Sequence, residues 1–98
     1  MTAPIAVVVR VPTVLRGLAQ GRAVLDLSLP AGATVADALD DIERDHPALV
    51  RRVRDEQGGL RQHVNIFLGQ DNIRGLDELA TVVGDGDELA ILAAISGG

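Results

Sequence analysis

An α+β fold, with one main helix packed on one face of a mixed β-sheet, is predicted by the order of the local patterns along the chain. Two short segments near the start, residues 5–11 and 23–29, have the composition of β-strands. Apolar residues then recur at helical spacing after Thr34. Two further short aliphatic stretches, residues 63–69 and 88–93, follow the helix. Strands that flank a single helix in this order are typical of an α+β domain.

The first two segments are predicted to pair as a hairpin. Residues 5–11 (IAVVVRV) are mostly β-branched and end before Pro12. Residues 23–29 (AVLDLSL) alternate, so that their leucines face the core while Asp26 and Ser28 face water. The connection contains Gly17 and Gly21, which we expect to act as turn residues, and it is longer than the tightest hairpin loops.

The main helix has a clear start and a clear stop. Thr34 is a favourable N-cap residue, and Asp37 three positions later completes a weak capping box. Pro47 prevents the same helix from continuing across its own amide. A short second helix is expected over residues 48–56, with Leu49, Val50 and Val53 inward. The stripe of the main helix that faces the core is Val35, Ala38, Leu39 and Ile42.

The remaining strands complete the sheet. A third strand is expected over residues 63–69, a very short edge strand starting at Ile73, and a last strand over 88–93 with Leu89 and Ile91 inward. A sharp bend at residues 84–87 (GDGD) precedes the last strand. The helical crossover allows the first and last strands to lie side by side and parallel in the middle of the sheet. This topology is the β-grasp, or ubiquitin-like, fold.

The facing of the third strand is left open by its residues. Val64, Ile66 and Leu68 lie on one face, and Asn65 and Phe67 on the other. Because Phe is among the residue types that are most often fully buried, and Phe67 is the only aromatic residue of the chain, we expect Phe67 in the core.

Composition excludes several classes of function. The chain of 98 residues has no cysteine, and its two histidines, His46 and His63, are far apart in the sequence, so neither thiol chemistry nor a metal site is expected. A net charge of −5 argues against nucleic acid and favours a partner with a basic surface. The first residues lack the basic region of a signal peptide, and no apolar run approaches the roughly 20 residues of a membrane span. We therefore expect a cytoplasmic protein without a membrane partner.

The sequence resembles the ubiquitin-like sulfur carriers of the MoaD/ThiS family, and within that family the CysO type. Three stretches carry the resemblance: DGDELAILAAISGG (residues 85–98), VNIFLG (64–69) and VPTVLRGLAQG (11–21). The resemblance spans almost the whole chain. It implies a β-grasp domain over residues 1–93 and a flexible Gly-Gly tail over residues 94–98.

The resemblance also implies a function and its partners. In the family, a ubiquitin-activating-type enzyme uses ATP to adenylate the terminal glycine, a sulfur donor converts the acyl-adenylate to a thiocarboxylate, and a biosynthetic enzyme accepts the sulfur. Mapped here, Gly98 carries the sulfur, and Ile95, Ser96 and Gly97 thread the tail into the partner. The chain itself would bind no cofactor and supply no catalytic residue, and we expect a monomer that acts as a carrier and not as an enzyme.

In β-grasp carriers the sheet face away from the helix meets the activating enzyme. We expect an apolar patch of this kind to mark the interaction site here. The candidate docking residues are Val8, Arg10, Pro12, Leu68, Ala90, Leu92 and Ala94.

Several alternatives stay open at this point. The CysO-like segment favours cysteine biosynthesis, in which the new cysteine would remain on the tail until a peptidase, such as a metallopeptidase, removed it. Carriers for molybdopterin, thiamine or a sulfur-containing secondary metabolite would share the same tail. A ubiquitin-like modifier that forms isopeptide bonds would begin with the same chemistry, and a plain interaction module would leave the tail without a role. All nine basic residues are arginine, so no lysine of this chain is available as an acceptor.

Overall fold

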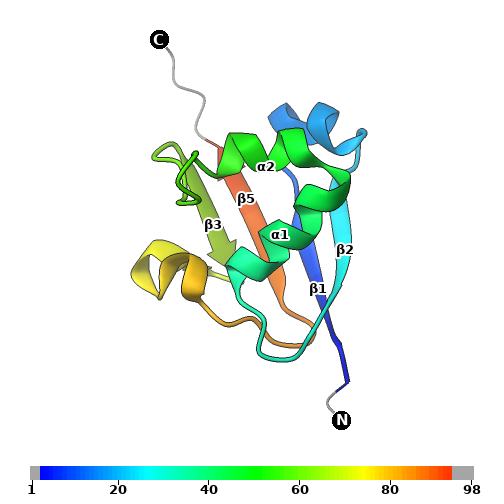
Figure 1. Ribbon diagram of the computed structural model, residues 1–98, viewed down its shortest axis with the longest axis vertical. Helices are drawn as coiled ribbons and strands as arrows, with labels where there is room; N and C mark the ends of the chain where they lie inside the picture. Colours follow the sequence, from blue (N-terminus) through cyan, green and yellow to red (C-terminus); the bar gives the residue numbers. More distant parts are fainter. Residues whose placement is uncertain (1–2, 94–98) are drawn as a thin grey trace.

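The computed structural model describes residues 3–93, which form a five-stranded mixed sheet with two helices on one face (Figure 1). The strands are β1 (Ile5–Arg10), β2 (Val24–Leu29), β3 (Val64–Leu68), β4 (Asp71–Asn72) and β5 (Glu88–Ala93). The helices are α1 (Val35–Asp45) and α2 (Pro47–Val53), with three short 3-10 helices, η1 (Thr13–Ala19), η2 (Ile73–Gly75) and η3 (Glu78–Ala80). The sheet order is β2-β1-β5-β3-β4, which confirms the predicted β-grasp topology.

The central pair of strands is parallel, as predicted. Val8 of β1 lies beside Glu88 of β5, and Arg10 lies beside Ala90. β1 also pairs antiparallel with β2 along its full length, so the predicted hairpin is present. β5 pairs antiparallel with β3 on its other side. The first and last strands of the chain therefore form the middle of the sheet.

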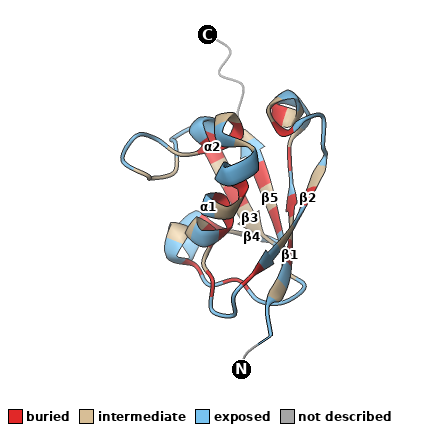
Figure 2. Cartoon of the chain, turned by 45° about the vertical axis from the view of Figure 1, so that its right-hand side comes forward, coloured by how far each residue is buried: buried red, intermediate tan, exposed pale blue. Residues whose placement is uncertain are grey.

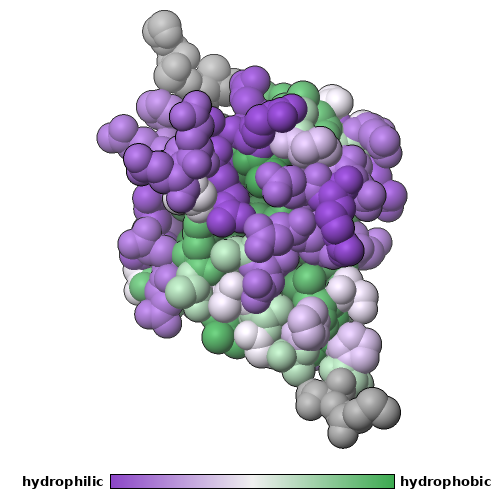
Figure 3. Space-filling view, viewed as in Figure 1, coloured by the Kyte–Doolittle hydropathy of each residue, from purple (hydrophilic) through white to green (hydrophobic). Residues whose placement is uncertain are grey.

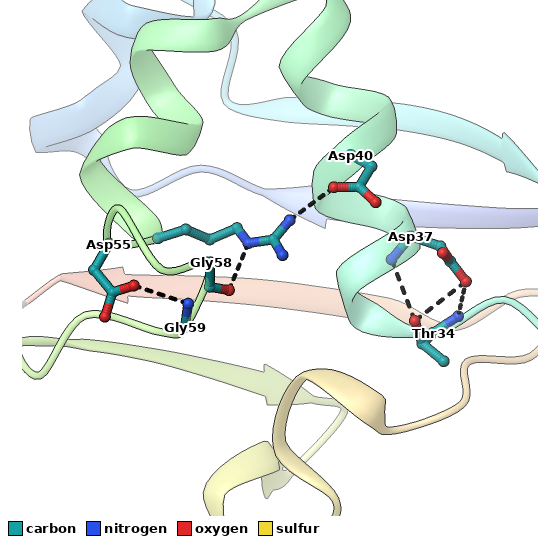
Figure 4. A network of polar contacts seen from close by, with 7 residues as sticks. Thr34, Asp37, Asp40, Asp55, Gly58 and Gly59 are labelled. Atoms are coloured by element: carbon teal, nitrogen blue, oxygen red, sulfur yellow. Dashed lines mark hydrogen bonds and ion pairs between the residues drawn. The ribbon is translucent and has the colours of Figure 1, made fainter.

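Helix α1 begins at the predicted cap. The Asp37 backbone N–H donates to the Thr34 hydroxyl at 3.2 Å, and the Thr34 backbone N–H donates to the Asp37 carboxylate at 2.9 Å (Figure 4). This reciprocal pair is a capping box, which satisfies two backbone donors at the helix start. The predicted stripe of Val35, Ala38, Leu39 and Ile42 is buried.

Helix α2 follows α1 after a break at His46 and begins with Pro47. Its predicted inward residues, Leu49, Val50 and Val53, are all buried. The loop after it is tied to α1, because the Arg54 guanidinium donates to Asp40 Oδ1 at 2.7 Å and to the Gly58 carbonyl at 2.9 Å (Figure 4). The two helices form one layer over the sheet (Figures 1 and 2).

The core lies between the helices and the sheet, and in the described part of the chain it is entirely aliphatic. Val7 and Val9 of β1 and Leu89 and Ile91 of β5 are each at most 2% exposed. Figure 2 shows buried parts of the central strands β1 and β5 in red, beside the helices.

Two local expectations are corrected by the structure. Gly17 lies inside η1 instead of in a turn, because Leu15 and Ala19 of this 3-10 helix are buried against the core. Gly21, in contrast, has the positive φ of a turn residue, 81°, as predicted. The short edge strand ends at Asn72 and does not start at Ile73, whose side chain is buried at the beginning of η2.

The predicted bend at residues 84–87 is present and is tied to β1. The Ala6 backbone N–H donates to Asp85 Oδ1 at 2.8 Å, and the Gly86 N–H donates to the Ala6 carbonyl at 2.7 Å. Gly86 has a φ of 84°, a conformation that side chains with a Cβ rarely adopt. The bend therefore aligns the start of β5 with β1.

Candidate functional site

The sheet face away from the helices carries a continuous row of cross-strand neighbours. Arg10 lies between Val24 of β2 and Ala90 of β5, and Ala90 lies beside Phe67 of β3. Phe67 in turn is opposite Asn72 of the edge strand. Residues that are paired across a sheet project to the same face, so these five side chains share the open face.

Next to this row, towards the end of β5, lies a leucine whose side chain is exposed. Leu92 is 49% exposed, whereas its neighbours Leu89 and Ile91 are buried on the other face. Val8 and Ala90 on the open face are half-buried. Pro12, also half-buried, lies two residues after the end of β1 and directly before η1. The open face therefore presents Val8, Arg10, Ala90 and Leu92, whereas Pro12 lies beyond the paired residues of β1.

The predicted facing of β3 is wrong. Val64 and Ile66 are 3% and 1% exposed, and Leu68 packs against the same core, so Leu68 lies on the helix side and does not belong to the docking face. Phe67 is not in the core but half-buried on the open face opposite Ala90. Aliphatic side chains fill the space between the helices and the sheet, and the aromatic ring lies on the opposite face of the sheet.

The polar groups of the open face are partly paired. Arg10 and Glu88, which are both well exposed, form an ion pair across β1 and β5. An exposed pair of this kind contributes little to stability. It does fix the position of one positive and one negative charge beside Val8 and Ala90.

A second polar network closes the edge of the face near the end of β5. The Arg74 guanidinium donates to the carbonyls of Arg61 and Val64 at 2.9 and 2.8 Å, and to Asn65 Oδ1 at 3.1 Å. The Asn72 side-chain amide also donates to Asn65 Oδ1, at 3.2 Å. Asn65 lies opposite Leu92. The network therefore stabilises the part of β3 that pairs with the end of β5. Arg74 was not predicted from the sequence, because residues 70–75 indicated only a turn and the start of a short edge strand.

The predicted tail residues lie outside the described residues. They are Ala94, Ile95, Ser96, Gly97 and Gly98. Within residues 3–93, the structure holds no group of histidine and carboxylate side chains that fits a metal ion. Over the same range, no helix is long and apolar enough to cross a membrane.

The comparisons with known proteins agree with this geometry. A family model described as the ThiS family matches residues 9–98. The chain belongs to the ThiS family. Its relatives include small sulfur carriers and ubiquitin-like modifiers. This chain is 33% identical to the sulfur carrier protein CysO of Mycobacterium tuberculosis over 94 residues. These residues cover 94% of this chain and 98% of the relative. It is 37% identical to the small archaeal modifier protein 1 of Haloferax volcanii over 78 residues, which cover 80% and 85% of the two chains.

The fold of this ThiS-family chain also matches solved structures. A chain of the BexX/CysO complex from Amycolatopsis orientalis is 34% identical and superposes with a TM-score of 0.83, over 94% of this chain and 99% of that one. The β-grasp fold and the resemblance to sulfur carriers are thereby confirmed.

Proposed function

We propose that this protein is a sulfur carrier whose C-terminal Gly98 is converted to a thiocarboxylate. The observation that carries the proposal is the match of the ThiS family model, whose range of residues 9–98 includes Gly97 and Gly98. The near-complete coverage of CysO from Mycobacterium tuberculosis supports the same reading.

The chemistry needs an electrophile that a carboxylate does not offer at neutral pH. An adenylating enzyme would let the Gly98 carboxylate attack the α-phosphorus of ATP with loss of pyrophosphate, and the sulfur donor would then attack the acyl carbon with loss of AMP. The enzyme supplies the catalytic groups in such a transfer, and the carrier supplies geometry. Two glycines without Cβ atoms allow close approach of a partner's backbone.

The open face is the surface that we expect the adenylating enzyme to bind. Its apolar members, Val8, Ala90 and Leu92, and the newly placed Phe67 lie on the two central strands and on β3. Because β5 runs directly into the tail, a partner seated on this face would also hold the tail's first residues. Arg10 and Glu88 give the face charges that a partner can match.

Cysteine biosynthesis is the pathway that we favour. The support is the relationship to the CysO proteins, which are named as sulfur carriers. In that pathway the acceptor would be a cysteine synthase-like enzyme acting on an activated serine, and a peptidase, such as a metallopeptidase, would release the product. We place the carrier in the cytoplasm, where such enzymes and ATP are present.

The deciding experiment is intact-mass measurement after incubation with ATP, sulfide and an adenylating enzyme from the same genome. The expected result is a mass increase equal to the replacement of one oxygen by sulfur, and no increase for a variant that lacks Gly98. An unchanged mass, with an enzyme shown to be active on another carrier, would contradict the proposal. A mass increase equal to one cysteine residue in material isolated from cells would support the pathway.

Protein modification is the second candidate function. The observation that favours it is the 37% identity to the small archaeal modifier protein 1. A modifier would form a bond between Gly98 and lysines of other proteins, and a tagged chain would then give a ladder on denaturing gels that resists thiol and base. A thiocarboxylate without any ladder would exclude the modifier and leave the carrier.

A further inference from the structure

The open face of the sheet extends to the edge strand β2, where it carries a carboxylate. Asp26 of β2 lies directly opposite Val8 of β1, and Glu88 of β5 lies beside Val8 on the other side. Residues that are paired across a sheet project to the same face, so two acidic side chains flank Val8. Both acidic residues are exposed. An enzyme that covers Val8 therefore meets both carboxylates.

The two carboxylates differ in their partners. Glu88 forms an ion pair with Arg10 on the same face. The ion pairs among residues 3–93 do not include Asp26. Arg22, which precedes β2, lines the same surface hollow as Asp26, but no ion pair joins the two side chains. Within the described strands, Asp26 is thus the one charged residue of the open face that no ion pair balances.

The position of Asp26 is fixed by the strand that carries it. β2 pairs with β1 along its full length, from the pair of Ile5 and Leu29 to the pair of Arg10 and Val24. Asp26 lies in the interior of this ladder. A charged group on a strand is held more precisely than one on a loop, so the carboxylate marks a defined point of the docking face.

A partner on the open face has to accommodate this carboxylate. Covering an unpaired carboxylate is strongly unfavourable unless a cation or hydrogen-bond donors replace its water. A lysine or arginine of the partner at this point would compensate the charge and would also accelerate the encounter of the two proteins. An acidic side chain at the same point would oppose binding. The charge of Asp26 therefore discriminates between partners whose apolar surfaces fit equally well.

We infer that Asp26 is a specificity-determining residue of the open face, and that the adenylating enzyme presents a lysine or arginine side chain to it. The inference rests on the proposed function, which supplies the partner. Asp26 acts in docking and takes no part in the chemistry at Gly98. Its contribution is to the affinity and to the rate of association, and not to the rate of the chemical step.

The test is titration calorimetry of the full chain with the adenylating enzyme, without ATP. Asp26→Arg should weaken binding at least about tenfold, because it sets two positive charges against each other, and Asp26→Asn should weaken it about threefold. The difference between Asp26→Asn and the native chain should shrink as the salt concentration rises, because salt screens exposed charges. Equal or tighter binding of Asp26→Arg would overturn the inference.

A matched control separates a local contact from an effect of net charge. Hydrophilic residues also cover much of the helix side of the molecule (Figure 3). Glu43→Arg makes the same change of net charge at an exposed position of α1, in the layer that covers the other face of the sheet. It should change the affinity by less than about twofold. Equal losses in Glu43→Arg and Asp26→Arg would contradict a contact at Asp26.

The kinetics of thiocarboxylate formation separate this inference from the proposed function. Asp26→Arg should raise KM for the carrier about tenfold and change kcat by less than about twofold, because the lost interaction belongs to docking. Sulfur transfer with equal KM in Asp26→Arg and Glu43→Arg would contradict the inference and leave the proposed function. Charge-selective binding without any sulfur transfer would contradict the proposed function and leave the inference.

The neutral variant keeps the inference testable if Asp26→Arg does not fold, which circular dichroism would show. Asp26→Asn is nearly the same size as the native residue and leaves the β2 ladder intact. The affinity of the native chain should then fall more steeply with salt than that of Asp26→Asn. Parallel salt dependences of the two chains would overturn the inference.

Discussion

Phe67 of β3 lies directly opposite Ala90 of β5 on the sheet face that the helices do not cover. The small Ala90 side chain leaves the aromatic ring accessible in the middle of the face, between the edge strand and β1. Its sequence neighbour Ile66, 1% exposed, points into the core. The only aromatic residue of the chain is thus available to a partner.

The first prediction compares Phe67 on the open face with its sequence neighbour Ile66 in the core. Phe67→Ala should weaken binding to the adenylating enzyme about tenfold or more, because aromatic residues often carry much of an interface's binding energy. It should cost only about 1–2 kcal/mol of unfolding free energy, less than the 3–5 kcal/mol typical of a fully buried Phe. Ile66→Ala is the matched control and should cost more, about 2–5 kcal/mol, measured by urea denaturation. A larger loss for Phe67→Ala than for Ile66→Ala would place the ring in the core.

The second prediction concerns Leu92, the exposed residue near the end of β5. Leu92→Glu should prevent binding to the adenylating enzyme while changing the unfolding free energy by less than about 1 kcal/mol, because the side chain is 49% exposed. Leu92→Met is the control and should bind nearly as the native chain does. Titration calorimetry and thermal unfolding measure the two quantities. Collapse of the fold in Leu92→Glu would mean that this residue is part of the core.

The elements that were predicted correctly are those whose signal lies in residues close together in the sequence. The capping box at Thr34 and Asp37 and the apolar stripe of α1 depend on residues three and four positions apart, which the sequence displays directly. The parallel pairing of β1 and β5 followed from the order of elements, since only a crossover with a helix allows it.

The facing of β3 could not be predicted in the same way. Apolar residues occupy both faces of this strand, so alternation alone does not separate Phe67 from Ile66 and Leu68. What decides it is the register with β5, which sets Ile66 beside Ile91 and Phe67 beside Ala90. The η1 helix was missed for a related reason: Leu15 and Ala19 are buried in a segment that contacts α2, which is distant in the sequence.

The third prediction tests the start of α1. Thr34→Ala should lower the unfolding free energy by about 1 kcal/mol, because the Asp37 N–H loses its acceptor at the helix N-terminus. Thr34→Ser keeps a hydroxyl and should recover most of the loss. Thr13→Ala, at an exposed position of η1, should stay within about 0.5 kcal/mol of the native chain. Urea denaturation of the three variants gives the comparison, and equal stabilities of Thr34→Ala and Thr34→Ser would show that the hydroxyl contributes nothing.

The fourth prediction addresses Arg74, whose guanidinium joins the start of β3 to the turn after β4. It donates to two main-chain carbonyls, of Arg61 and Val64, and to the Asn65 side chain. Val64 is opposite Ala93, the last described residue of β5, so these bonds hold the strand next to the base of the tail. Arg74→Ala should therefore speed hydrogen exchange at Val64 and at the neighbouring hydrogen-bonded pair of Asn65 and Leu92 by about tenfold, the effect of losing roughly 1.4 kcal/mol of local stability.

The lysine variant separates charge from geometry at this position. Arg74→Lys keeps the positive charge but loses the planar fork that reaches three acceptors at once, so its exchange rates should resemble those of Arg74→Ala. Arg52→Ala, at an exposed position of α2, is the control and should leave exchange at Val64 unchanged. If the end of β5 must be held for the tail to reach the adenylation site, both Arg74 variants should also lower the rate of thiocarboxylate formation while binding of the open face persists. Native exchange rates in Arg74→Lys would show instead that charge alone stabilises this corner, and native sulfur transfer in Arg74→Ala would separate the network from the function of the tail.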